Sequence, residues 1–188
     1  MSDHAGRVRR ASGHAEATAI LPVAAPLVPP YNNAVHPIAP SDIAALLTEA
    51  EASPRRRSHL LLHAGHEDQV QRLLIALQPG SYVRPHQHSQ QWEMLVLQRG
   101  RLDVLAFAPD GVVLARHRLD RAAPVIQIPA RTWHAGVVLE PDTVVMEVKP
   151  GPYRPNEFAD WAPEENTSAA TDLASWLERA LPGMRWDR

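Results

Sequence analysis

The sequence predicts an antiparallel β-barrel or jelly roll with a helix at each flank, and three observations support this fold class. Short segments of strand-like composition follow one another between residues 70 and 150, and turn signals separate them at intervals of about 8 to 12 residues. Helical periodicity occurs only outside this region. The 188 residues suit one domain, and a 45% share of hydrophobic residues is enough for a core.

The expected strands follow from apolar or alternating runs that end at turn residues. Gly or Pro stands in several of the gaps, at Pro79-Gly80, Arg99-Gly100, Pro109-Asp110-Gly111 and Pro141-Asp142. The strands are residues 70–77, 82–88, 93–98, 102–107, 112–119, 125–128, 133–139 and 143–149.

Helices are expected on both sides of these strands. Ser41-Asp42 is typical of a helix start and Ser53-Pro54 of a helix end, with apolar residues on one face between them. Residues 171–181 form a second amphipathic pattern. We therefore expect a disordered or extended proline-rich lead-in over residues 1–40 and one domain over residues 41–165, with its barrel core at 70–150. A tail with a short helix should follow over residues 166–188.

Composition excludes several classes of function. A formal net charge of -2 gives no electrostatic basis for binding nucleic acid or an anionic membrane. Because there is no cysteine, disulfides, thiolate metal sites and cysteine nucleophiles are excluded. The apolar stretch near the N-terminus is interrupted by Pro22 and Pro26, which argues against a membrane span or a secretion signal. We expect a cytoplasmic protein.

The residues that carry chemistry begin near residue 86. Residues two apart in a strand point to the same face, so His86 and His88 can direct two imidazoles to one point. Glu93 lies at an odd offset from His88, so a turn must return it from the next strand. His134 adds a third imidazole from a later strand. Three imidazoles and one carboxylate suit Fe, Mn, Zn, Ni or Co and leave positions open for water or substrate.

The spacing of this segment resembles the first signature of the cupin superfamily. Gly80, five residues, His86-Gln87-His88, four residues, Glu93, six residues and Gly100 follow in that order. Residues 129–134 resemble the second signature, in which cupins often carry Gly where Arg131 stands. The resemblance implies a cupin-type barrel with a divalent metal on His86, His88, Glu93 and His134.

Further segments resemble the WbuC-type cupin-fold metalloproteins and cover about residues 41–165. They are SPRRR at 53–57, QRLL at 71–74, PGSY at 79–82, PHQH at 85–88, WH at 133–134, EVKPGPY at 147–153 and FADWAPE at 158–164. Such proteins are often associated with bacterial O-antigen and surface-polysaccharide gene clusters. The resemblance therefore implies a small polar ligand, such as a sugar or a sugar nucleotide.

Three further residues are candidates for acid–base catalysis. Glu147 and Lys149 alternate on the last strand and share a face, so they could act as general base and substrate clamp inside the barrel. A structural ion pair or a solvated rim is the alternative. Tyr82 shares a face with His86 and His88, so it could line the pocket and also move protons. Packing of the phenol in the barrel wall is the alternative.

Basic residues before the barrel offer two weaker hypotheses. Arg55, Arg56 and Arg57, together with Arg72, could bind a phosphate or carboxylate, or they could form a solvated face. His59 and His63 stand four residues apart and could share a metal on a helix, but no acidic partner or third histidine lies nearby.

Two classes of function remain open. The first is a metal-dependent enzyme that acts on a small polar metabolite, either an isomerase or lyase or, with iron, a dioxygenase. The second is a non-catalytic binding or regulatory module with the same barrel. Since exposed barrel sheets commonly pair, we expect a homodimer.

Overall fold

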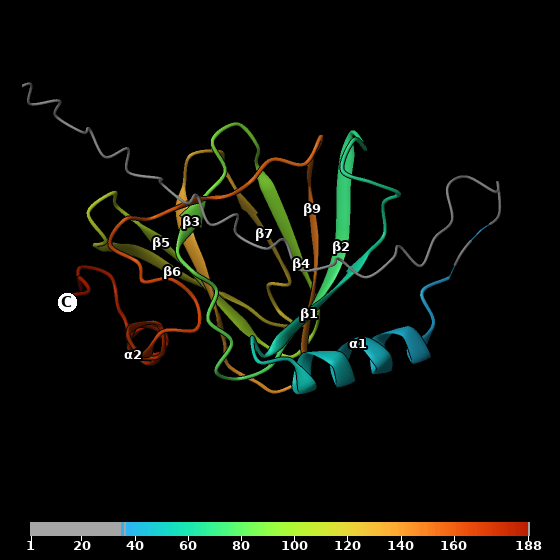
Figure 1. Cartoon of the computed structure of the whole chain (residues 1–188), viewed down its shortest axis with the longest axis horizontal. Coiled ribbons are helices and arrows are strands. Elements are labelled where there is room, and N and C mark those ends of the chain that lie inside the picture. The colour runs from blue at the N-terminus through green and yellow to red at the C-terminus, as the bar shows by residue number, and fades with distance from the viewer. Residues whose placement is uncertain (1–34, 36, 188) are drawn as a thin grey trace, which may run out of the picture.

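The computed structural model describes residue 35 and residues 37–187. The strands form two five-stranded antiparallel sheets, and the predicted fold class, an antiparallel jelly roll with a helix at each flank, is confirmed (Figure 1). The first sheet has the order β1 (Arg57–Leu61), β2 (Val70–Leu77), β9 (Thr143–Pro150), β4 (Glu93–Arg99) and β7 (Val125–Ile128). The second has the order β10 (Glu157–Phe158), β3 (His86–Gln87), β8 (Trp133–Val138), β5 (Leu102–Phe107) and β6 (Val113–Leu119).

Strand alternation divides the side chains between the interior and the outer faces. On β8, His134 and Gly136 line an internal cavity, whereas Ala135 and Val137 belong to an outer apolar cluster. A separate apolar cluster fills the space between the sheets with residues from both of them, including Leu95 and Val145 of the first sheet and Leu102, Val104 and Val138 of the second. Leu95, Leu102 and Val145 of this cluster also line the cavity, so apolar and polar side chains meet in its wall.

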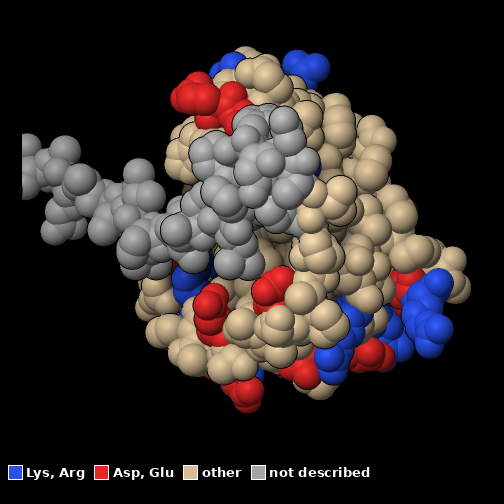
Figure 2. Space-filling model, turned by 90° about the vertical axis from the view of Figure 1, so that its right-hand side faces the viewer, with Lys and Arg blue, Asp and Glu red and all other residues tan. Residues whose placement is uncertain are grey.

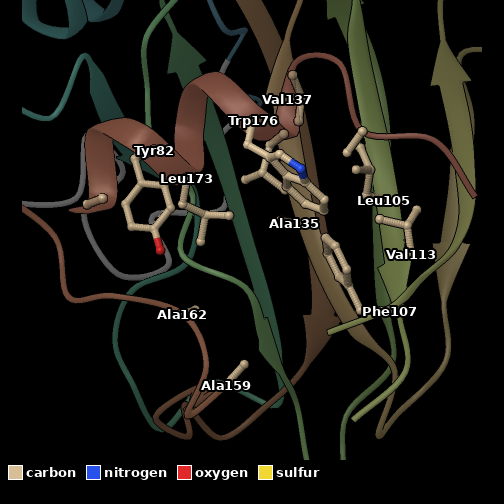
Figure 3. Packing of buried hydrophobic residues seen from close by; sticks show 13 residues of the cluster. Tyr82, Leu105, Phe107, Val113, Ala135, Val137, Ala159, Ala162, Leu173 and Trp176 are labelled. Atoms are coloured by element: carbon tan, nitrogen blue, oxygen red, sulfur yellow. The ribbon is translucent and has the colours of Figure 1, made fainter. Parts of the chain in front are cut away.

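The helices cover the two outer faces. Helix α1 (Pro40–Ala52) places Leu46 and Ala50 against Leu74 and Val144 of the first sheet. Helix α2 (Ser168–Leu177) places its apolar face on the second sheet. Figure 3 shows Leu173 and Trp176 of α2 pointing toward the strands. Each sheet thus buries part of its outer face as well as its inner face, which explains why apolar residues occur at successive positions along some strands.

An ion-pair network fixes the end of α2 to the second sheet. The carboxylate of Asp103 on β5 binds Arg116 and Arg118 of β6, with nitrogen–oxygen distances of 2.5 and 2.9 Å. The guanidinium of Arg116 also donates to the carbonyl oxygens of Leu177 and Ala180, both at 2.9 Å. The network satisfies carbonyl groups that have no partner within the helix.

The turn between β4 and β5 needs glycine. Gly100 has φ 80°, and a Cβ atom on it would lie 2.3 Å from Oγ1 of Thr143. A side chain at this position would therefore meet both backbone strain and a steric clash.

Several element boundaries differ from those expected. The first helix begins at Pro40, not at Ser41, and Asp42 accepts a hydrogen bond from the Ala39 amide. The expected strand over 82–88 is reduced to β3, because residues 82–85 adopt no regular structure. The second helix begins at Ser168, three residues before the expected start, and Thr167 is its N-cap. Strands β1 and β10 were not expected.

Some sequence expectations concern regions with limited description. The expected lead-in over residues 1–40 lies outside the described residues, apart from residue 35 and residues 37–40. Among the described residues, no helix is long and apolar enough to cross a membrane. On the described part of the face in Figure 2, basic and acidic side chains are interspersed rather than gathered by sign. This distribution agrees with the small net charge.

Candidate metal centre and cavity

The four residues predicted to bind metal lie together between the two sheets. Their candidate ligand atoms are all within 4.8 Å of one another, and all four side chains are buried. His86 and His134 pair across β3 and β8 of the second sheet. Glu93 begins β4 in the first sheet, and His88 follows β3. The cluster therefore joins residues from both sheets.

Backbone carbonyl groups orient two of the imidazoles. Nδ1 of His86 lies 2.8 Å from the carbonyl oxygen of Arg84, and Nδ1 of His134 lies 2.8 Å from that of Thr132. Because a carbonyl oxygen only accepts, each Nδ1 carries a hydrogen, so Nε2 is the nitrogen with which the neutral form of each ring can bind a metal. This arrangement is the usual one for metal-binding histidines.

Glu93 is the anionic centre of the cluster. Its Oε2 lies 2.9 Å from Nε2 of His88 and 3.1 Å from Nε2 of His134. Burial would raise the pKa of Glu93, but hydrogen bonds with His134 and His88 outweigh it and hold the pKa well below its usual value. Burial, followed by the charge of His134, lowers the pKa of His86 to about 3. A buried carboxylate facing three imidazole nitrogens is a donor set that a divalent transition metal fits.

A cavity of about 190 Å³ lies beside this cluster, and Glu147 and Lys149 line it with the four candidate ligands. Nζ of Lys149 is 2.7 Å from Oε1 of Glu147, and the two residues are 8% and 7% exposed. Burial and then the charge of Glu93 raise the pKa of Glu147 to about 7. Burial would lower the pKa of Lys149, but the charge of Glu147 outweighs it and raises the pKa. The pair is thus an interior ion pair beside the cluster, not a solvated rim.

Tyr82 lies elsewhere. It is not among the described residues that line the cavity; it belongs to the outer cluster beneath α2, with Leu173 beside it (Figure 3). Its hydroxyl donates to the carbonyl oxygen of Pro163 at 2.9 Å. The expectation that Tyr82 shares a face with His86 was wrong because residues 82–85 are not a strand, so alternation does not extend to residue 82.

The basic segment before β2 contributes to the cavity in a way that the sequence did not predict. The cavity wall includes Arg55, Arg57 and His59 of this segment, together with Glu165 from the turn before α2. None of the four was assigned to the cavity from the sequence. The spacing of Arg57 and His59 was a signal, because strand β1 places both side chains on one face. Arg55 precedes the strand, so alternation does not account for its position. Of the other arginines considered, Arg56 and Arg72 do not line the cavity.

The histidine pair proposed for a helix does not form a site. Residues 57–61 are strand β1, so the helical spacing of His59 and His63 does not apply. His63 is held by the backbone of Arg72, with its Nδ1 2.7 Å from the carbonyl oxygen. Burial and then the charges of Arg57 and Arg55 lower the pKa of His59 to about 4.

Arg131 occupies a backbone conformation that favours glycine. Its φ is 61°, in the left-handed region, and its amide donates to the carbonyl oxygen of His88 at 2.8 Å. This is the position at which the cupin signature often has Gly. The turn before β8 therefore retains the shape that the signature implies, and it ties the strand of His134 to His88.

Comparisons with known proteins leave the function open. A family model described as a domain of unknown function, DUF6016, matches residues 38–119, which is less than half of the chain. No curated protein shows significant similarity.

Among solved structures, several chains are similar to this one over about half of its length. KdgF from Halomonas sp. has 21% identity and a TM-score of 0.42, with 52% of this chain and 80% of that chain covered. The cupin domain of Cnp3 from Schizosaccharomyces pombe has 11% identity and a TM-score of 0.41, covering 51% and 65%. Oxalate oxidase in complex with glycolate has 18% identity and a TM-score of 0.46, covering 57% of each chain. Similarity at this level says nothing of the ligand of this chain.

Proposed function

We propose that this protein is a metal-dependent cupin of the WbuC type that acts on a small polar metabolite, such as a sugar or sugar nucleotide of surface-polysaccharide metabolism. One observation carries the metal-dependent part of the proposal: four buried ligand atoms lie within 4.8 Å of one another on the wall of a cavity. The metabolite class rests on the sequence segments that resemble WbuC-type proteins.

The residues around the ligands supply the groups that a reaction would need. His86, His88, Glu93 and His134 would hold the metal, which would polarise a carbonyl or hydroxyl group of the substrate, or provide redox chemistry if it is iron. Lys149 presents an ammonium group and Glu147 a carboxylate on the same wall. The ammonium can hold a substrate oxygen while the carboxylate accepts a proton from a neighbouring hydroxyl or carbon.

The metal content of purified protein tests the first part of this proposal. Protein prepared without a metal-affinity tag should contain about one equivalent of a transition metal per chain. A chelator should lower the melting temperature of the wild type. The double variant His86→Ala, His88→Ala should contain no metal, so a chelator should leave its melting temperature unchanged. His66→Ala, His117→Ala is a matched control, since both histidines are exposed and neither lines the cavity. A double variant that folds and still contains as much metal as the wild type would refute the proposed metal site.

The variant Glu147→Gln tests the role of the cavity. It keeps the shape of the side chain and removes its charge, so metal content should remain while the affinity for sugars and sugar nucleotides, or their turnover, changes. Binding without turnover by metal-loaded wild type would favour a regulatory module.

We infer that the protein is a cytoplasmic homodimer. Light scattering tests the dimer. A measured mass of about 21 kDa would refute it, because one chain has a mass of 20.8 kDa.

A further inference from the structure

The charged residues at the edge of the metal cavity form a second feature with chemistry of its own. Arg55, Arg57 and Glu165 line the metal cavity, and the same three residues also line a neighbouring groove of about 430 Å³ that runs along α2. They are the described residues common to both. The three side chains therefore stand at the boundary between the metal cavity and the outer groove.

The contacts among these side chains reproduce those of a bound oxyanion. Oε2 of Glu165 lies 2.8 Å from Nε of Arg55, and Oε1 lies 2.5 Å from Nη2 of Arg57. Oε1 is also 3.4 Å from Nη2 of Arg55. Two guanidinium groups thus contact both oxygens of one carboxylate, which is the geometry by which arginine binds carboxylates and phosphates.

Arg57 is held more firmly than the carboxylate. It begins β1, its side chain is 8% exposed, and its Nη1 donates to the carbonyl oxygen of Tyr82 at 2.7 Å. Glu165 lies in a turn between β10 and α2, and its side chain is 25% exposed, whereas that of Arg55 is 35% exposed. A rotation about the side-chain bonds of Glu165 would leave Arg57 in place and open the boundary.

The charges leave the arginine pair incompletely neutralised. Glu165 supplies one negative charge to two guanidinium groups, and Arg84 adds another cation to the cavity wall. Lys149 is engaged by Glu147, and Glu93 faces the histidines. A divalent ion at the cluster would add more positive charge. The cavity is therefore suited to a ligand that carries an anion.

We propose that Arg55 and Arg57 form an oxyanion subsite at the edge of the metal cavity, that the side chain of Glu165 occupies it in the absence of ligand, and that the natural ligand carries a carboxylate or a phosphate that displaces Glu165. This proposal deepens the proposed function by naming an acidic or phosphorylated metabolite as the class that the site accepts. The subsite itself is independent of the metal.

Anion binding by calorimetry tests this subsite, with inorganic phosphate and acetate as separate probes and with metal-free and metal-loaded protein. In metal-free protein, Arg57→Gln should weaken binding of the preferred anion on the order of tenfold, since it removes charge-assisted hydrogen bonds. Glu165→Gln should strengthen it on the order of tenfold, since a competing charge is lost. Preference for phosphate or for acetate tells which oxyanion the ligand carries.

The controls separate this proposal from the metal site. Arg99→Gln removes an exposed arginine that pairs with Asp142 and does not line the cavity, and it should leave anion affinity unchanged. Arg55→Gln, at the more exposed of the two arginines, replaces Arg57→Gln if that variant unfolds. Anion binding that needs the metal and persists in the arginine variants would overturn the subsite while leaving the metal site intact. Weaker anion binding by Glu165→Gln would show that Glu165 only ties the turn to the barrel, and would also overturn it.

Discussion

Replacement of Asp103 by asparagine tests how the second sheet holds α2. The side chain of Asp103 is 1% exposed, and its two oxygens bind Arg116 and Arg118. Arg116 in turn donates to carbonyl oxygens at the end of α2. Asp103 therefore orients the guanidinium that fixes the helix end, and its loss should loosen the contact between α2 and the sheet.

The size of the effect follows from the exposure of the three partners. Removing one partner of a buried ion pair costs about 3–5 kcal/mol. Arg118 is 52% exposed, so solvent screens its share, whereas Arg116 is 13% exposed. We expect Asp103→Asn to lower the free energy of unfolding by about 2–3 kcal/mol. For a chain of this length, that corresponds to a fall in melting temperature of roughly 4–12 °C.

The effect should depend on pH. Burial would raise the pKa of Asp103, but hydrogen bonds from Arg118 and Arg116 outweigh it and hold the pKa below its ordinary value of 3.8. The unfolded chain therefore takes up a proton at a higher pH than the folded protein does. The stabilisation by Asp103 should be complete above about pH 4 and decline as the pH falls further.

Thermal unfolding followed by circular dichroism between pH 7 and pH 3 measures this difference. Asp187→Asn is the matched control, because that carboxylate is 80% exposed. The difference between wild type and Asp103→Asn should narrow in acid. A variant within about 0.5 kcal/mol of wild type at pH 7 would refute the reasoning, because surface substitutions alone have effects of that size. So would a difference that widens in acid.

Two further predictions concern the outer core and the cavity wall. Leu173 has no exposed area and packs between α2 and the second sheet, so Leu173→Ala should lower the free energy of unfolding in urea by about 3 kcal/mol. Leu181→Ala is the control, because Leu181 is 58% exposed, and equal effects of the two substitutions would contradict the packing. Because the pKa of His59 is lowered from 6.5 to about 4, the unfolded chain binds its proton first, and wild type should lose stability as the pH falls through that range. His59→Gln should show a shallower acid dependence in the same pH series, and an unchanged slope would assign the effect to other groups.

Much of the barrel could be predicted because its strands are marked locally. The expected strands 70–77, 102–107 and 125–128 coincide with β2, β5 and β7, since alternation and turn residues are properties of neighbouring positions. The cluster was predicted differently, because the spacing from His86 to Glu93 and the segment before His134 resemble the two cupin signatures.

The failures occurred where structure depends on a distant partner. Strand β1 exists through its pairing with β2, and its basic residues gave no apolar signal. Residues 82–85 do not pair with a neighbouring strand, so the strand begins only at His86, and Tyr82 packs beneath α2.

The sequence by itself determined the order of the strands, the donor set of the cluster and the shared face of Glu147 and Lys149. Only the tertiary structure decided that this face is buried beside the cluster, and that Glu165 meets Arg57 across 108 positions of the chain. The physical reason is that periodicity fixes the direction of a side chain relative to its own strand. The closure of two sheets over one cavity fixes what that side chain faces.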